Sequence, residues 1–423
     1  MRNYNTNWFA MASIAGALIF APAAQADAVL DWNAIMQSTV AAQAPFLQAR
    51  YAAITQLAVF EAVNATTKEY KPYLDTGRIA AAQGASADAA AVAAAHVVLK
   101  GYFPAVAAML DALRASSLAA IPDGPAKSAG ITVGEAAAAA VMAARNNDGS
   151  SPAAFYLPTS SRPGEWQTTA GCTPAGGTFY QWRNVKPFGL RSAAQFQLDE
   201  PPALRSVRYT RDYSEVKSVG AANSTVRPQD RTDVARYFAV TSPVAVWNPV
   251  ARQLSVAAGD SLSENARAFA LLNMAMSDAA VATFDTKYKY TTWRPETAIG
   301  MGQTDGNDTT DADSSFTPLI VAPCFPGYPS AHATLSSAAR EVLERLYTPR
   351  RRSLILSNPA VPGITLRYTK LKEITEDIDD ARVYGGSHFR FEQEAGADLG
   401  RRVGEYLYKN VIGPAASCSC DSR

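Results

Sequence analysis

Long runs of helix-forming sequence constrain the fold of this chain more than any other feature. Apolar residues recur at helical spacing over residues 40–64, and residues 84–114 and 126–146 are rich in alanine, the strongest helix former. Helical patterns resume in several later segments, at residues 211–220, 229–241, 254–286, 330–347 and 374–410, the last interrupted by two glycines. The patterns favour paired helices over strands. We therefore expect a mainly α protein made of helical bundles with long irregular loops.

Two segments are expected to be irregular. Residues 147–202 are rich in Gly, Pro, Ser and Thr, and so long a stretch is more typical of a functional surface than of a linker. Residues 305–315 carry several aspartates but lack the sixth-position glycine and the terminal glutamate of an EF-hand. We expect a solvated loop there rather than a calcium site.

The first 26 residues have the pattern of a secretory signal: Arg2, an apolar stretch over residues 8–21, and the small residues Ala24 and Ala26 around Gln25. We expect residues 1–26 to be removed on export to the periplasm or the medium, and residues 27–423 to form one α-helical domain. No later segment has eighteen uncharged apolar residues, so no stable membrane insertion is expected. The net charge of +1 argues against nucleic-acid binding.

Four cysteines fit an exported protein, and they allow three pairings. A bond between Cys172 and Cys324 is attractive, because it would tie a long loop beside Phe325. Cys418 and Cys420 lie in the tail, and a metal site there is disfavoured because no partner pair lies nearby.

Lys287 and Arg294 begin the chemistry-bearing part of the chain, which spans residues 280–400. They are seven positions apart, about two helical turns, so both side chains point to the same side. Two cations so placed repel each other unless an anion lies between them. A planar guanidinium and a mobile ammonium together suit a tetrahedral oxyanion.

Pro329, Ser330, Ala331 and His332 have the pattern of a helix start, with a fixed φ and a capping hydroxyl. The free N–H groups of a first helical turn attract anions. His332 would lie in that turn, where its imidazole can give or take a proton.

Arg382 and His388 are six positions apart, and on one continuous helix their side chains would diverge. Gly385 and Gly386 let the backbone break between them, so that both side chains can reach one ligand. Glu392, four residues after His388, is placed to bond the other ring nitrogen.

The order and spacing of these segments resemble the vanadium-dependent haloperoxidase and type-2 phosphatidic acid phosphatase superfamily. The matching motifs are Lys287-x6-Arg294-Pro295, Pro329-Ser330-Ala331-His332 and Arg382-x5-His388. Three further stretches, at residues 60–64, 182–188 and 215–220, resemble the bacterial haloperoxidase-like branch. The sequence departs from the motifs at Ala331, where glycine is common, and at Ala381, where serine is common. The resemblance implies a mainly α, haloperoxidase-like fold.

The resemblance also implies roles. His388 would be the axial ligand of vanadium, or the nucleophile of a phosphatase, and His332 would be the general acid–base. Vanadate oxygens would be held by three cations, a hydroxyl and a backbone N–H, those of Lys287, Arg294, Arg382, Ser330 and Ala331. The implied reaction is the oxidation of halide by hydrogen peroxide, with a small organic acceptor as the final partner. The sequence leaves the oligomeric state open, a homo-oligomer included.

The choice between peroxidase and phosphatase depends on aromatic residues near the motifs. Phe284, Trp293 and Phe325 resemble the aromatic lining of the halide side in chloroperoxidase-like members, although each taken singly is as readily a core aromatic. They favour a vanadate-dependent haloperoxidase. The alternative is an exported acid phosphatase that acts through a phosphohistidine.

Overall fold

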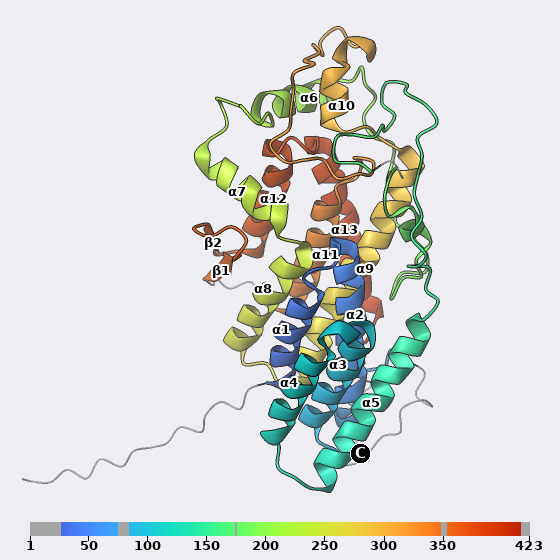
Figure 1. The fold of residues 1–423 in the computed structure, drawn as a ribbon, viewed down its shortest axis with the longest axis vertical. Coiled ribbons are helices and arrows are strands. Elements are labelled where there is room, and N and C mark those ends of the chain that lie inside the picture. Colours follow the sequence, from blue (N-terminus) through green and yellow to red (C-terminus); the bar gives the residue numbers. More distant parts are fainter. Residues whose placement is uncertain (1–26, 75–83, 174–175, 348–352, 416–423) are drawn as a thin grey trace, which may run out of the picture.

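Helices form nearly all the regular structure in the computed structural model, which describes residues 27–74, 84–173, 176–347 and 353–415 (Figure 1). The helices are α1 (Ala28–Val40), α2 (Pro45–Thr67), α3 (Ala87–Tyr102), α4 (Ala107–Ala119), α5 (Pro125–Arg145), α6 (Val207–Val219), α7 (Gln229–Val240), α8 (Pro243–Ala258), α9 (Leu262–Tyr290), α10 (Pro295–Gly300), α11 (Ala331–Leu346), α12 (Leu371–Tyr384) and α13 (Arg390–Asn410). The mainly α prediction is confirmed. The expected signal segment, Cys418 and Cys420 lie outside the described residues.

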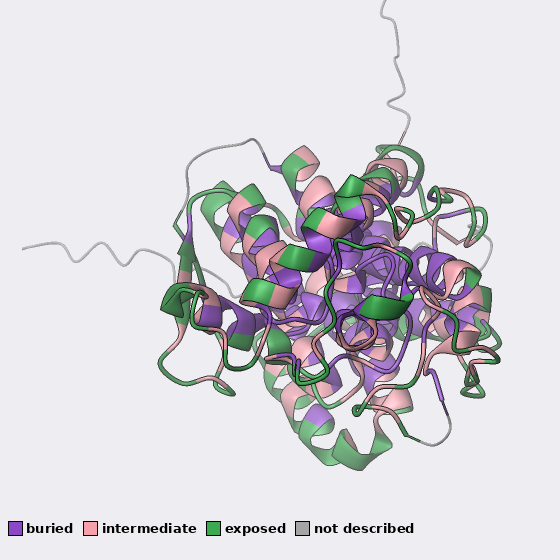
Figure 2. Ribbon diagram, turned by 90° about the horizontal axis from the view of Figure 1, so that it is seen from above, coloured by how far each residue is buried: buried purple, intermediate pink, exposed green. Residues whose placement is uncertain are grey.

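Helix α9 is the shared centre of the fold. It is 29 residues long, begins at a capping box made by Ser261 and Glu264, and buries most of its length. One side of it packs against α2, which also contacts α3 and α5, and another packs against α11 and α13. Figure 1 shows the early helices at one end of the molecule and α6, α7, α10 and α12 toward the other. The buried residues concentrate along the middle of this arrangement (Figure 2).

Helices α11 and α13 approach each other closely because α13 presents glycines to its neighbour. A Cβ at Gly400 would clash with the carbonyl oxygen of Thr334, and one at Gly404 would meet the carbonyl oxygen of Ala338 at 2.6 Å. The glycines thus let the two backbones meet almost directly. This contact places the first turn of α11 next to the segment that leads into α13.

The structure differs from the expected elements in three places. The predicted helix at 84–114 is divided by the 3₁₀ turn η2 (Pro104–Val106) into α3 and α4. Helix α1 and most of α8, which holds Pro249 in its interior, were not expected, and the predicted run at 254–286 is divided between the end of α8 and α9. An antiparallel hairpin, β1 (Leu354–Ser357) and β2 (Thr365–Tyr368), follows α11, with Leu354 paired to Tyr368. These strands are four residues each, too short for a period-of-two pattern to stand out.

The irregular segment at 147–202 is a packed cover rather than a linker. It contains the 3₁₀ turn η3 (Tyr180–Asn184), which lies on α9. Two of its own side chains, Trp166 and Trp182, are buried. The buried carboxylate of Asp278 on α9 accepts the backbone N–H groups of residues 188–190 at 2.6–2.9 Å. Asp278 therefore fixes this segment and does not pair with Lys287 or orient His332.

No single helix among the described residues is long and apolar enough to cross a bilayer. One pair, α3 together with residues 104–119, meets the length and composition test jointly, with a bend of 117° between its halves.

Candidate oxyanion site

Three buried cations converge at the end of α9. Lys287 lies in the last turn of α9, Arg294 is the residue before α10, and Arg382 lies in the last turn of α12. None of the three is more than 2% exposed. We call these three residues the cation cluster. The two-helix arrangement predicted around Gly385 and Gly386 is present, because α12 ends at Tyr384 and Gly386 has a φ of 76°.

Burial destabilises the charged, protonated forms of the three residues in the cation cluster. Burial, together with the neighbouring Arg294, holds the pKa of Lys287 well below its usual range. Burial also lowers the pKa of Arg294, and that of Arg382, to about 10 in each case. Glu392 is the carboxylate that offsets these charges, and burial raises its pKa to about 7. One carboxylate facing three cations leaves an excess of positive charge inside the protein.

Backbone carbonyls hold part of the cluster in place. The Lys287 ammonium donates to the carbonyl oxygens of Pro326 and Gly327 at 2.6 and 2.8 Å. Arg294 donates from Nε to the carbonyl of Phe325 at 2.9 Å, and from Nη1 to that of Ser387 at 3.0 Å. These bonds orient the side chains without neutralising them.

Other donors of the cluster have no such partner. Arg294 Nη2, Arg382 Nε and Arg382 Nη1 are buried and have no hydrogen-bond partner among the described residues. A buried charged donor left unpaired is expensive, so a fold that keeps three of them points to an anion as their partner.

The start of α11 supplies the neutral part of the site. Ser330 caps the helix, with its hydroxyl accepting the N–H of Ala333 at 3.4 Å, and its own N–H donates to the carbonyl of Glu392 at 2.9 Å. Ala331 is the first residue of α11, and it is not among the described residues with positive φ. Alanine therefore fits where the superfamily motif commonly has glycine, and the free N–H groups of the helix start remain.

His388 is fixed in one protonation form by its two neighbours. Its Nδ1 lies 2.6 Å from Glu392 Oε2, and its Nε2 lies 2.9 Å from Arg294 Nη1. A guanidinium only donates, so Nε2 accepts and the ring proton is on Nδ1, facing the carboxylate. Burial and the cation cluster hold the pKa of His388 well below its usual range. The result is a neutral imidazole whose Nε2 lone pair faces the cations.

His332 occupies the first turn of α11 and keeps partial exposure, unlike the cations behind it. Burial lowers its pKa well below the usual range, and Arg382, Arg294 and Lys287 add to the effect. His332 is therefore neutral beside the bare cluster. An anion among the cations would reverse the electrostatic part of this shift and favour protonation.

Of the three aromatic residues predicted for the halide side, only Phe284 and Phe325 contact each other. The rings of Phe284 and Phe325 are in contact at 5.4 Å, and Phe325 also lies under Lys287 Nζ at 5.2 Å. Trp293 is fully buried but is placed beside the hydroxyl of Tyr209 on α6 instead.

Two further aromatic residues join Phe284 and Phe325, and neither was predicted from the sequence. Phe46, at the start of α2, contacts Phe284 at 4.6 Å and Phe325 at 5.9 Å. Phe179 contacts Phe46 at 5.0 Å. Both come from segments far from the motifs in sequence, so no local pattern linked them to the site.

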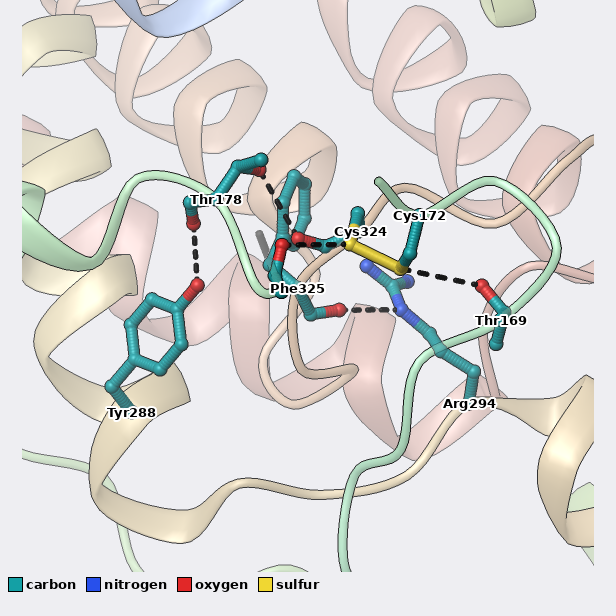
Figure 3. The surroundings of a disulfide bond; sticks show 8 residues. Thr169, Cys172, Thr178, Tyr288, Arg294, Cys324 and Phe325 are labelled. Carbon is teal, nitrogen blue, oxygen red and sulfur yellow. Dashed lines mark hydrogen bonds between the residues drawn. A yellow bond between two sulfur atoms is a disulfide. The ribbon is translucent and has the colours of Figure 1, made fainter. Parts of the chain in front are cut away.

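A disulfide between Cys172 and Cys324 anchors the loop that precedes α11 (Figure 3). The carbonyl of Cys324 also accepts the N–H of Thr178 at 2.8 Å. The next residues, 325–327, provide the carbonyls that orient Lys287 and Arg294. The sequence left the pairing open, and the structure forms the bond between Cys172 and Cys324, which links the segment at 147–202 to the cation cluster.

Two further features, His96 and the loop at 305–315, lie outside the site. His96 is packed in α3, with Nε2 2.7 Å from Asp111 Oδ1. In the loop at 305–315, the Asp305 carboxylate accepts from Asn307 and Thr310, so it stabilises its own turn. Within the described ranges, no group of three or more His, Cys, Asp or Glu residues could hold a metal ion.

Part of the chain is similar in sequence to known proteins. Residues 267–414 match the family described as VCPO second helical-bundle domain. The vanadium chloroperoxidase of Curvularia inaequalis is 30% identical over 197 residues, a match that covers 40% of this chain and 32% of that relative. The chain thus spans about a third of the length of the curated relative it matches.

The fold is also shared with solved structures of bacterial enzymes. A bacterial vanadium-dependent iodoperoxidase superposes with a TM-score of 0.76 at 23% identity, covering 93% of this chain and 97% of the other. An apo-type bacterial vanadium-dependent chloroperoxidase gives 0.71 at 17% identity, covering 87% and 94%. The resemblance seen in the three motifs is therefore confirmed: this chain has the vanadium haloperoxidase fold, and residues 267–414 match the second helical-bundle domain of that family.

Proposed function

We propose that the chain is a vanadate-dependent haloperoxidase that oxidises halide with hydrogen peroxide. The observation that carries this proposal is the set of buried, unpaired guanidinium donors beside a neutral histidine whose Nε2 lone pair faces the cations. Halide would lose two electrons to the peroxide, and with one proton the products are a hypohalous acid and water.

The residues present fit vanadate. Its oxygens carry negative charge, which matches the excess of cations over carboxylates in the cluster. Lys287, Arg294 and Arg382 would hold those oxygens, helped by the Ser330 hydroxyl and the N–H of Ala331. His388 would bind the metal through Nε2, since Glu392 keeps the ring proton on the opposite nitrogen. When bound, vanadate supplies a Lewis-acidic centre that activates hydrogen peroxide toward halide.

The chain's own residues would transfer the proton and keep water away from the halide. His332 is the partly exposed imidazole of the site, so it would pass a proton between solvent and the reacting oxygen atoms. Phe46, Phe284 and Phe325 form an apolar wall beside Lys287, where a weakly hydrated anion such as a halide is favoured over water. Arg294 and Lys287, in contact with the face of Phe325, would keep halide near the reaction centre.

Reconstitution with orthovanadate tests the activity. We expect vanadate-dependent halogenation of a phenolic reporter dye in the presence of hydrogen peroxide and bromide or iodide. Phosphate-ester hydrolysis by the same preparation, with no halogenation at any vanadate concentration, would contradict the proposal and favour a phosphatase.

A pair of matched variants tests the site. His388→Ala should abolish orthovanadate binding in calorimetry, because it removes the Nε2 lone pair. His96→Ala changes the same residue type in a buried position away from the cluster, and its vanadate affinity should equal that of the wild type. Normal vanadate binding by His388→Ala would overturn the assignment.

We also propose that the protein is exported. A disulfide in the described structure supports this, because such bonds persist in oxidising compartments. N-terminal sequencing of protein recovered from a secreting host should give a start at Asp27, and a start at Met1 would contradict the proposal.

A further inference from the structure

A cavity of about 730 Å³ opens beside His332, on the side where that imidazole is exposed. Three separate parts of the chain form it: the turn between α1 and α2, the junction of α7 and α8, and the end of β1. Helix α8 contacts α1, α11 and β1, which brings these parts together (Figure 1). Its size lies in the range of roughly 300–1,000 Å³ that holds small organic ligands. Hydrogen peroxide and halide ions need far less room.

The cavity wall carries no formal charge. None of its sixteen described lining residues is Asp, Glu, Lys or Arg. Small apolar side chains form half of it: Ala41, Pro45, Ala239, Val240, Ala245, Pro249, Pro359 and Ala360. An ionised ligand would find no counter-charge in direct contact among the described lining residues, so the loss of its hydration would be poorly offset.

Four polar side chains of the wall are bonded in two pairs. Ser242 donates to Gln48 Oε1 at 2.5 Å, and Gln48 Nε2 donates to the carbonyls of Ala41 and Gln43. Asn358 Nδ2 donates to Thr241 Oγ1 at 2.7 Å, which fastens the end of β1 to the end of α7. The cavity is therefore held in shape before any ligand arrives, and a ligand would be recognised mainly by shape and apolar contact.

We propose that this cavity binds the organic acceptor, and that the acceptor is a neutral, electron-rich aromatic molecule. The inference rests on the proposed haloperoxidase function. In that function, His332 would lie between the source of hypohalous acid and the bound ring. In the substitution step the ring carbon bonds to the halogen and the O–halogen bond breaks. The ring proton leaves with the departing hydroxide as water. Capture at this site would compete with escape of the hypohalous acid into solution.

Calorimetric titration with 2-naphthol, with and without orthovanadate, tests the site directly. Ala245→Phe fills the cavity from α8, and we expect it to raise the Kd for 2-naphthol by at least about tenfold. Val240→Trp enlarges a residue that is 56% exposed at the rim, and so tests the same wall without demanding space in the core. Ala257→Phe is the matched control, since it makes the same change on an exposed part of α8 and should leave the Kd unchanged.

Charge selection is tested with 6-hydroxy-2-naphthalenesulfonate, which adds one negative charge to the same ring system. We expect it to bind at least about tenfold more weakly than 2-naphthol. Equal binding of the two probes would overturn the neutral class. No binding of 2-naphthol to the wild type, or an unchanged Kd in both cavity variants, would overturn the site itself.

Iodide oxidation without any organic acceptor, followed as triiodide, separates this inference from the function on which it rests. A wild type that forms no triiodide, but whose 2-naphthol binding is lost in the two cavity variants, would contradict the haloperoxidase function and leave the binding site standing. Triiodide formation together with 2-naphthol binding that ignores the cavity variants would contradict the acceptor site alone.

Discussion

Replacing Arg382 with methionine should have opposite effects on folding and on anion binding. Arg382 is 2% exposed, and its Nε and Nη1 have no hydrogen-bond partner among the described residues. Burial lowers its pKa to about 10. At about 1.4 kcal/mol for each pKa unit, the charged guanidinium costs the anion-free protein about 3 kcal/mol. Methionine has a similar reach and carries no charge.

The anion-free Arg382→Met protein should therefore be more stable than the wild type, by about 1–3 kcal/mol. Orthovanadate binding should move the other way. Two charge-assisted hydrogen bonds, at about 1.5 kcal/mol or more each, would be lost, which corresponds to a Kd raised about 100-fold or more. One substitution thus raises the free energy of unfolding and removes ligand affinity.

Urea unfolding in anion-free buffer measures the first effect, and calorimetric titration with orthovanadate measures the second. Arg401→Met is the matched control, because Arg401 has a side chain 47% exposed on α13 and should change both quantities little. If Arg382→Met is less stable than the wild type without anion and binds orthovanadate equally well, the reasoning about the cation cluster is wrong.

Three other predictions concern the scaffold. Burial raises the pKa of Glu61 to about 7, so the stability that its protonation contributes is fully present below about pH 4.5 and is lost as the pH rises through 7. In urea unfolding, the stability of Glu61→Gln relative to the wild type should therefore improve by about 3 kcal/mol between pH 4 and 8, and a constant difference would contradict this. Changing Cys172 and Cys324 to serine should lower the free energy of unfolding by up to about 5 kcal/mol, because the bond closes a loop across 152 positions and so restricts the unfolded chain. A loss below about 1 kcal/mol would contradict this entropic argument. Gly400→Ala should lower the free energy of unfolding by about 1–3 kcal/mol, because the added Cβ forces α11 and α13 apart. Gly413→Ala is the control: nothing lies within 4 Å of its added Cβ, so thermal melts should show little change.

Local sequence was enough to predict the residues of the cation cluster. The glycine break explains why Arg382 and His388 meet. Lys287 and Arg294 do not lie on one continuous helix, as their spacing had suggested, because α9 ends at Tyr290 and Arg294 follows it in an extended conformation. The bond between His388 and Glu392 follows from their spacing of four on one helix start. The helical fold followed in the same way, from periodicity and alanine content.

Other parts of the site were not visible in the sequence. Phe46 and Phe179 complete the apolar group around Phe325, although each comes from a segment with no motif. Trp293 is next to Arg294 in sequence but is buried beside Tyr209. A side chain's neighbours across a core depend on how helices pack, and no local pattern in a single sequence reveals that packing.

The sequence by itself indicated which cations and histidines belong to the candidate oxyanion site, because these residues fall in three short segments. Only the tertiary structure decided that three guanidinium N–H groups lack partners among the described residues, that Asp278 holds the segment at 147–202, and that a cavity without charged residues in its described lining borders His332. The physical reason is that burial, desolvation and cavity shape arise where segments distant in the chain meet. Those meetings depend on close contacts such as that of Gly400 with Thr334, which exist only once the helices have packed.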